Sequence, residues 1–158
     1  MTKDEAYQKA ASLCAKSEKC PADIVKKLTA WEIDDDAIEE IIDQLTREKF
    51  LDEERYALAF VADKFRFEHW GRIKINYALR TKGIRSSAIR QALDERIDPD
   101  EYVETCTRLL RDRMRSMPQP LSPNDRARLY RFGTQRGFES GIISRALSLI
   151  NQGDEDDD

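Results

Sequence analysis

The sequence has very few of the residues from which catalytic and metal centres are built. It contains one histidine, His69, and its three cysteines, Cys14, Cys20 and Cys106, do not have the spacing of a metal site. It has no glycine-rich phosphate loop and no nucleophile elbow. We therefore expect no enzymatic activity, no cofactor and no metal, and we interpret the cysteines as reduced thiols.

Long apolar runs are missing as well. No stretch of eighteen apolar residues occurs, which argues against a membrane-spanning helix, and residues 1–5 lack the apolar segment of a signal peptide. We expect a cytoplasmic protein. Alternation with a period of two residues, which is typical of a half-buried strand, is also absent. The sequence therefore predicts an all-α fold.

Charged residues are abundant, at 37% of the chain, and they are segregated along it. Residues 32–54 include eleven acidic and two basic residues, a balance of −9, whereas residues 55–93 include nine basic and two acidic, a balance of +7. Residues 105–137 carry +6, and residues 154–158 are all acidic. Such blocks indicate charged partners. The alternative is solvated helix faces with local ion pairs, each of which contributes little.

The stretch from residue 72 to residue 82 predicts a helix in the middle of the chain. Gly83 follows it, at the position where a left-handed residue commonly ends a helix. The apolar residues of this helix form two strips, Ile75 with Ala78 and Leu79, and Ile73 with Tyr77. We therefore expect this helix to be contacted from two directions.

One apolar spacing recurs three times. Ile84 and Ile89 have the spacing of a hydrophobic staple, in which a residue before a helix packs on one in its first turns. The other two pairs with this spacing are Ile33 with Ile38, and Phe138 with Ile143. The first residues of the three pairs are separated by 51 and 54 residues. Similarity at a nearly fixed period indicates a repeat array, whereas chance likeness among amphipathic helices is the alternative.

We therefore predict three tandem three-helix repeats that form an elongated, curved helical array. The predicted domains are repeats at 1–51, 52–99 and 100–152, and a disordered acidic tail at 153–158. Four apolar residues should be buried at matching places in the first two repeats, namely Leu28, Leu79, Ile38 and Ile89. A proline-rich loop at 117–123 interrupts the third repeat.

Two aspartates, Asp34 and Asp52, are predicted to cap helices. The helix that follows Asp52 carries a series of aromatic residues, Tyr56, Phe60, Phe65 and Phe67. Such a series can stack on nucleic-acid bases, but aromatic residues at helical spacing more often form core, and we expect core here.

Three segments, taken together, resemble the RecX family of bacterial regulatory proteins. They are residues 50–57 (FLDEERYA), 70–75 (WGRIKI) and 79–84 (LRTKGI). The resemblance extends over the whole chain and is closest over residues 50–93. It implies three tandem three-helix repeats and a non-enzymatic regulator that binds RecA recombinase filaments on DNA. Such a regulator inhibits ATPase and strand-exchange activity in recombination, DNA repair and the SOS response.

By this resemblance, basic residues of the middle repeat would face the filament, namely Arg72, Lys74, Arg80 and Lys82. The hypothesis extends to further basic residues, Arg85, Arg90, Arg108, Arg111 and Arg115. The expected partners are the RecA filament and, weakly and without sequence preference, single-stranded DNA. We expect a monomer. The alternatives are a stand-alone helix-turn-helix DNA-binding module and an adaptor that binds only protein.

Overall fold

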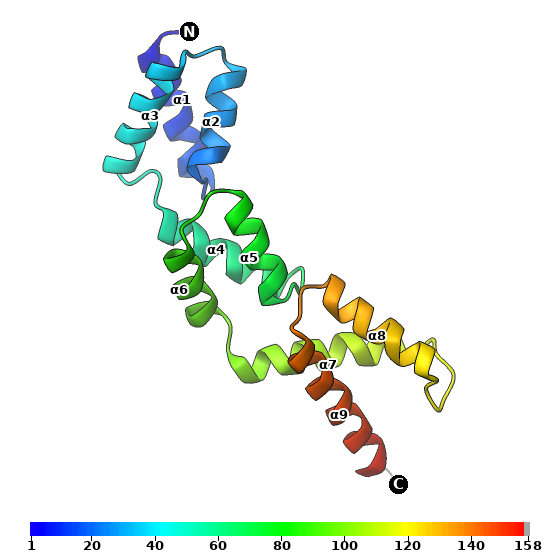
Figure 1. The fold of residues 1–158 in the computed structure, drawn as a ribbon. Helices are drawn as coiled ribbons and strands as arrows, with labels where there is room; N and C mark the ends of the chain where they lie inside the picture. Colours follow the sequence, from blue (N-terminus) through cyan, green and yellow to red (C-terminus); the bar gives the residue numbers. More distant parts are fainter. Residues whose placement is uncertain (157–158) are drawn as a thin grey trace. The chain divides into compact units, whose positions relative to one another are not determined.

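The computed structural model describes the backbone of residues 1–156 and the side chains of residues 1–153. This part of the chain is all-α, as predicted, and contains no strand (Figure 1). Its helices are α1 (Lys3–Lys16), α2 (Pro21–Ala30), α3 (Asp35–Arg47), α4 (Glu53–Arg66), α5 (Arg72–Thr81), α6 (Ser86–Arg96), α7 (Pro99–Met114), α8 (Pro123–Gln135) and α9 (Ser140–Asp156).

Helix starts follow local signals in the sequence. The Asp34 carboxylate accepts a hydrogen bond from the Ala37 N–H at 2.8 Å, and Asp52 accepts one from the Arg55 N–H at 3.0 Å. Both predicted caps are confirmed. Each satisfies an N–H group that has no partner within its own helix.

The second helix of each three-helix repeat ends in the same way. The second residue after the helix has a left-handed backbone in all three cases, with φ of 61° at Glu32, 82° at Gly83 and 97° at Gly137. The N–H of the next residue then donates to a carbonyl five residues earlier, in the pairs Ile33 to Leu28, Ile84 to Leu79 and Phe138 to Gly133. This is a Schellman motif. The glycine stop predicted at Gly83 is confirmed.

Glu32 is the only one of these three left-handed residues that is not glycine. We expect Glu32→Gly to raise the free energy of unfolding by about 0.5 to 1 kcal/mol, because a side chain in the left-handed region is strained. Urea unfolding would measure the change. The matched control is Glu39→Gly, at an exposed position inside α3, which should instead lower stability by about 1 kcal/mol. A Glu32→Gly protein no more stable than the wild type would contradict the expectation.

The chain forms two compact units. The first comprises Met1–Phe60 and Leu79–Ala92, and the second comprises Val61–Ala78 and the residues from Leu93 onward. The middle repeat therefore contributes residues to both units. The repeat boundaries at 51 and 99 remain predictions, because a division by packing differs from a division by sequence similarity.

In the first unit, α1, α2 and α3 pack against one another (Figure 1). Their shared core includes Ala6, Ala10, Ile24, Leu28, Ile38, Ile41, Leu45 and Leu51. The four residues predicted to be buried at matching places are all buried, at 0% exposure for Leu28 and Leu79, 7% for Ile38 and 1% for Ile89. The repeated apolar spacing thus marks equivalent core positions.

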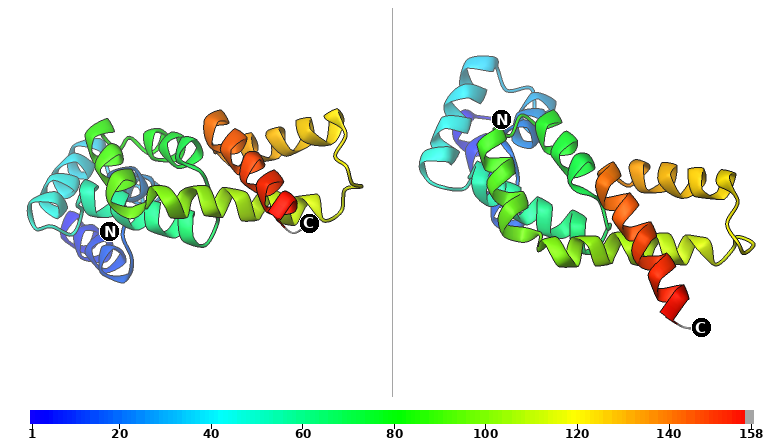
Figure 2. Two further views of the ribbon diagram at one scale, coloured as in Figure 1. Left: turned by 90° about the horizontal axis from the view of Figure 1, so that it is seen from below. Right: turned by 60° about the horizontal axis from the view of Figure 1, so that its bottom comes forward.

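In the second unit, α7 packs against α8 and α9, and α9 (red) crosses α7 (yellow-green) in both views of Figure 2. Tyr102 is fully buried at the centre of this packing. Its ring lies 5.1 Å from the Phe138 ring and 5.9 Å from the Phe65 ring, measured between centroids. Aromatic contacts at these separations stabilise a core beyond their buried area.

Two expectations about exposure are wrong. The Ile73 and Tyr77 strip of α5 is 54% and 73% exposed, so the described residues bury only the other strip, with Ile75 and Leu79. Phe67 is 70% exposed, although Tyr56 and Phe65 are buried as predicted. The apolar pattern identifies both strips correctly. Burial of the second strip, however, requires a second neighbouring element, and periodicity alone does not predict whether one is present.

The end of the chain also differs from the prediction. α9 extends to Asp156, past residue 153, where the disordered tail was predicted to begin. A helix that is already anchored, here by buried Ile143 and Ile150, gains further residues at little cost. Residues 157 and 158 of the predicted tail lie outside the described residues.

Candidate interaction surfaces

The nine basic residues of the hypothesis are divided between the two units. The first unit contains Arg80, Lys82, Arg85 and Arg90. The second contains Arg72, Lys74, Arg108, Arg111 and Arg115. Several of them contact other parts of their own unit.

Lys82 pairs with a residue of the first repeat. Its Nζ donates to Asp23 Oδ1 at 3.0 Å, and both side chains are about one-third exposed. The hydrogen bond to Asp23 raises the pKa of Lys82 above its ordinary value. Burial alone would raise the pKa of Asp23, but hydrogen bonds from Lys82 and Cys20 hold it below its ordinary value. Both groups are therefore charged at neutral pH, and they link α2 to the end of α5.

Arg85 pairs with the start of α4. Its Nε lies 2.9 Å from Glu53 Oε2, and its guanidinium is also 3.7 Å from Glu54 Oε1. Arg80 and Arg90 are exposed, and within the described part of the chain neither forms an ion pair. Of the four residues of the hypothesis that lie in this unit, Arg80 and Arg90 are therefore the ones available to a partner.

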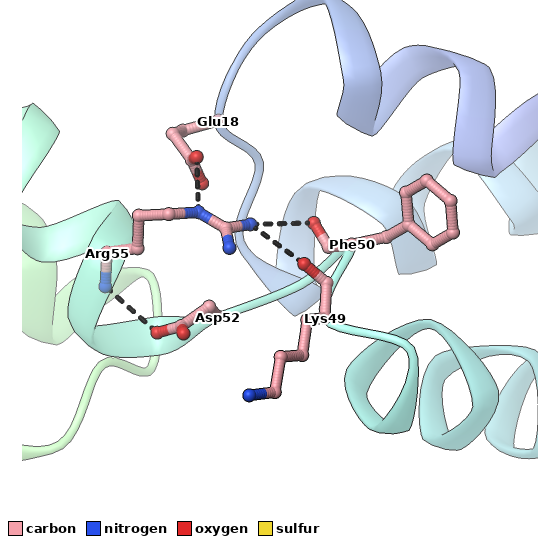
Figure 3. A network of polar contacts seen from close by, with 5 residues as sticks. All are labelled: Glu18, Lys49, Phe50, Asp52 and Arg55. Atoms are coloured by element: carbon pink, nitrogen blue, oxygen red, sulfur yellow. Dashed lines mark hydrogen bonds and ion pairs between the residues drawn. The ribbon is translucent and has the colours of Figure 1, made fainter.

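A second network in the first unit centres on Arg55 (Figure 3). Its Nε donates to Glu18, and its Nη2 donates to the carbonyls of Lys49 and Phe50 at 3.1 and 3.2 Å. The Arg55 side chain thus joins the α1–α2 loop to the segment after α3. Part of the segment 50–57, which supports the resemblance, therefore has a structural role at this joint.

Arg72 has a comparable role in the second unit. Its guanidinium lies 4.0 Å from the centre of the Tyr102 ring and donates to Glu139 Oε2 at 2.9 Å. Its backbone N–H donates to the Tyr102 hydroxyl at 2.8 Å, and that hydroxyl donates to Glu139. Burial, followed by the hydrogen bond to Glu139, raises the pKa of Tyr102 well above its ordinary value, so the hydroxyl remains a donor.

The start of α5 is capped by the end of α8. The N–H of Gly71 donates to the Arg136 carbonyl at 2.8 Å, and the N–H of Ile73 donates to the Gly137 carbonyl at 3.0 Å. With the bond from Arg72, three successive N–H groups at this helix start bind acceptors from the third repeat. Groups at this position have no partner within their own helix. The middle and third repeats are thus joined through the backbone.

Lys74 lies beside the same joint. Its Nζ is 4.5 Å from the centre of the Trp70 ring, and Lys64 approaches that ring to 5.0 Å. Lysine ammonium groups over an indole face are attracted by the π electrons. Four residues of the hypothesis, Arg72, Lys74, Lys82 and Arg85, therefore make contacts within the protein. Their predicted role toward a partner remains a hypothesis.

The arginines of the third repeat are more accessible. Arg108 and Arg111 line one hollow of about 330 Å³ between α7 and α9, together with Arg145, Asp100 and Glu104. Arg115 does not line this hollow and pairs with Asp112 at 3.2 Å. The structure therefore brings together two of the three arginines of the predicted ladder.

A second hollow, of about 320 Å³, lies between α7 and α8 and was not predicted. Three arginines line it, Arg113, Arg128 and Arg131, and none of the described residues in its lining is acidic. The Arg113 guanidinium lies 4.7 Å from the centre of the Phe132 ring, and Arg128 is 3.9 Å from Asp125. The spacing of Arg128 and Arg131 on one helix could have indicated from the sequence that these two arginines share a face. That Arg113 lies beside them depends on how α7 and α8 pack.

The described residues contain no group of three histidine, cysteine, aspartate or glutamate residues that could hold a metal ion. Among the same residues, no helix is both long and apolar enough to cross a membrane. The features available for function are therefore the basic hollows along α7, the exposed arginines of the first unit, and the exposed strip of α5.

In comparisons with known proteins, similarity to RecX proteins extends along most of the chain. The family models of the first, second and third three-helix domains of RecX match residues 6–45, 52–93 and 100–147. The regulatory protein RecX of Pseudomonas fluorescens is 32% identical over 140 residues, which cover 88% of this chain and 87% of that protein.

The regulatory protein RecX of Oceanobacillus iheyensis is 28% identical over 142 residues and 90% of this chain, but this chain spans only 51% of that longer protein. The crystal structure of RecX from Lactobacillus salivarius has the same fold, with a TM-score of 0.84 at 21% identity over 95% of this chain and 97% of that one. With its three domain matches and a relative above 30% identity along nearly its full length, this chain belongs to the RecX family of regulatory proteins.

Proposed function

We propose that this protein binds the RecA recombinase filament on DNA and lowers its ATPase and strand-exchange activity. The observation that carries the proposal is the match of all three RecX domains, in order, to one chain. Relatives in this family are named regulatory proteins. Regulation by binding also suits a chain whose described residues offer charged surfaces and no cluster for a metal.

The arginine hollows along α7 support a contact with the DNA of such a filament. Arginine side chains neutralise phosphates and release counterions, which provides affinity without reading the bases. The α7–α8 hollow is the better candidate of the two, because its described lining carries three arginines and no carboxylate. The α7–α9 hollow includes Asp100 and Glu104, which weaken its attraction for phosphate.

The test is a titration of RecA ATPase activity on single-stranded DNA. We expect the wild type to suppress hydrolysis. The Arg113→Glu and Arg131→Glu double variant should need at least about tenfold more protein, because several phosphate contacts act together. The control is Lys16→Glu with Arg96→Glu, which changes the net charge equally at exposed positions outside the hollow.

Two outcomes would contradict the proposal. If the wild type leaves ATP hydrolysis unchanged at saturating concentration, the protein does not regulate RecA. If it instead protects a defined duplex sequence at high salt, without recombinase, the helix-turn-helix alternative replaces the proposal, since phosphate contacts alone give neither sequence preference nor salt resistance.

A further inference from the structure

The exposed strip of α5 is an unusual feature of this surface. Ile73 and Tyr77 lie one turn apart and are 54% and 73% exposed, whereas Ile75 and Leu79 on the other face are fully buried. Residues four apart on a helix are neighbours on its surface. The pair thus presents a branched aliphatic side chain beside an aromatic ring to the solvent.

The other two repeats show that the fold does not require apolar residues here. The 51- and 54-residue offsets place Ala22 and Lys26 of α2, and Ala127 and Arg131 of α8, at the positions of Ile73 and Tyr77. These four residues are also exposed. The buried positions, by contrast, are apolar in all three repeats, with Ile24, Ile75 and Leu129 equivalent to one another. The apolar pair is therefore specific to the middle repeat, and a role in folding does not account for it.

Along the sequence, the charged residues around the pair are all basic. Residues 69–93 contain no acidic residue, and α5 itself carries Arg72, Lys74 and Arg80. Arg80 is exposed, while Arg72 and Lys74 are half-buried beside their partners Glu139 and Trp70. A surface with an apolar centre and a basic surround is complementary to an apolar pocket surrounded by carboxylates.

We infer that Ile73 and Tyr77 anchor a docking surface for an acidic protein partner, into whose apolar pocket the pair inserts. A protein fits the pair better than a nucleic acid does, because bases stack on aromatic rings and an isoleucine offers no ring. Exposed tyrosines that become buried at an interface are frequent energetic hot spots. This inference rests on the proposed function, because the partner to be tested is the RecA protein of the filament.

The test variant copies the pair found in α2. Ile73→Ala with Tyr77→Lys replaces the apolar residues with the types that α2 carries at Ala22 and Lys26, so the helix should fold unchanged. The variant also adds one positive charge. Electrostatic attraction to carboxylates or phosphates is thus kept or increased, and only the apolar contact is lost. Binding is measured by cosedimentation with RecA filaments on single-stranded DNA, and by fluorescence anisotropy with single-stranded DNA alone.

We expect the double variant to bind the filament at least about 30-fold more weakly, the size of effect that a hot-spot pair produces. Its affinity for single-stranded DNA alone should be unchanged or slightly higher. The conservative pair Ile73→Val with Tyr77→Phe should retain most of the filament affinity. Phe67→Ser is the matched control, because it removes a similarly exposed ring, at 70%, from another place in the same unit.

The other outcomes overturn the inference. If the double variant binds the filament like a filament-binding wild type, α5 is not the docking surface, although the proposed function stands. If it loses affinity for single-stranded DNA alone, the pair contacts nucleic acid. An equal loss of filament affinity in the Phe67→Ser protein would mean that exposed apolar residues bind the filament regardless of their position. A wild type that does not bind filaments at all overturns the proposed function and this inference together.

Discussion

Replacing Gly71 with alanine should destabilise the second unit by at least about 3 kcal/mol, through steric overlap and the loss of hydrogen bonds. A Cβ atom at Gly71 would stand 2.3 Å from the carbonyl carbon and oxygen of Gly137 and 2.5 Å from the N atom of Phe138. All three are backbone atoms, so no side chain can rotate away. The start of α5 and the end of α8 would have to separate, and the N–H bonds of Gly71 and Ile73 would be lost.

Thermal unfolding followed by circular dichroism would measure this change, with an expected fall in Tm of roughly 6 to 12 °C. Gly141→Ala is the matched control. It lies in the first turn of α9, and within the described part of the chain no atom beyond its own helix lies within 4 Å of an added Cβ, so we expect a gain of about 0.5 kcal/mol from helix propensity. A Gly71→Ala protein that melts with the wild type would show that α5 and α8 do not approach as closely as described.

Truncation of Tyr102 to alanine should cost about 3 to 5 kcal/mol, the usual loss for a large aromatic residue in a core. The side chain is fully buried, contacts the Phe65 and Phe138 rings, and lies under the Arg72 guanidinium. Tyr102→Phe keeps the ring and removes only the hydroxyl. It should still cost about 1 to 3 kcal/mol, because the Arg72 N–H and the Glu139 carboxylate each lose a partner in a half-buried site.

Urea unfolding of the two variants would separate the contribution of the ring from that of the hydroxyl. Tyr130→Phe is the control, because its hydroxyl bonds to the Ser144 hydroxyl at the surface, where water can replace the partner. We expect a change within about 0.5 kcal/mol there. If Tyr102→Phe proved equally harmless, the hydroxyl would not be an essential part of the joint between the middle and third repeats.

The parts of the fold that were predictable depend on short-range signals. The caps at Asp34 and Asp52 and the glycine stop at Gly83 are each determined by residues a few positions apart. The buried positions followed from the apolar period, so Leu28 and Leu79 were identified without a structure. Comparison of the repeats with one another strengthened the prediction of the core, since three separate segments have the same apolar spacing.

The parts that were not predictable depend on contacts between distant residues. Arg72 was predicted to face a partner because it is basic and lies in a basic stretch, but Glu139, with which it pairs, is 67 residues away. The hollow of Arg113, Arg128 and Arg131 requires the packing of α7 on α8. Local sequence contains no information on either of these pairings. From the sequence alone, a basic residue that pairs within the protein cannot be distinguished from one that contacts a partner.

Contacts between distant residues also explain why the segments that resemble the RecX family are distinctive. Among the segments that carried it, Arg55, Gly71 and Arg72 all lie at joints between repeats, where they contact backbone or buried groups. A residue at such a joint is restricted by several neighbours at once, which explains why these segments are distinctive in sequence. Residues that meet a partner are thus better sought beside the joints, as with Ile73 and Tyr77, than among the most distinctive motif positions.

The capping of α5 by the end of α8 has a practical consequence for work with fragments. A fragment that stops at residue 99 contains the whole sequence of the predicted middle repeat but lacks Tyr102, Arg136 and Gly137, the residues that accept the first hydrogen bonds of α5. In such a fragment α5 would begin with three exposed donors and fray. In a deletion series designed from the sequence repeats, such a fragment would lose activity because of a folding defect. This loss would then be mistaken for the loss of a binding site. Point substitutions in the intact chain avoid this confusion.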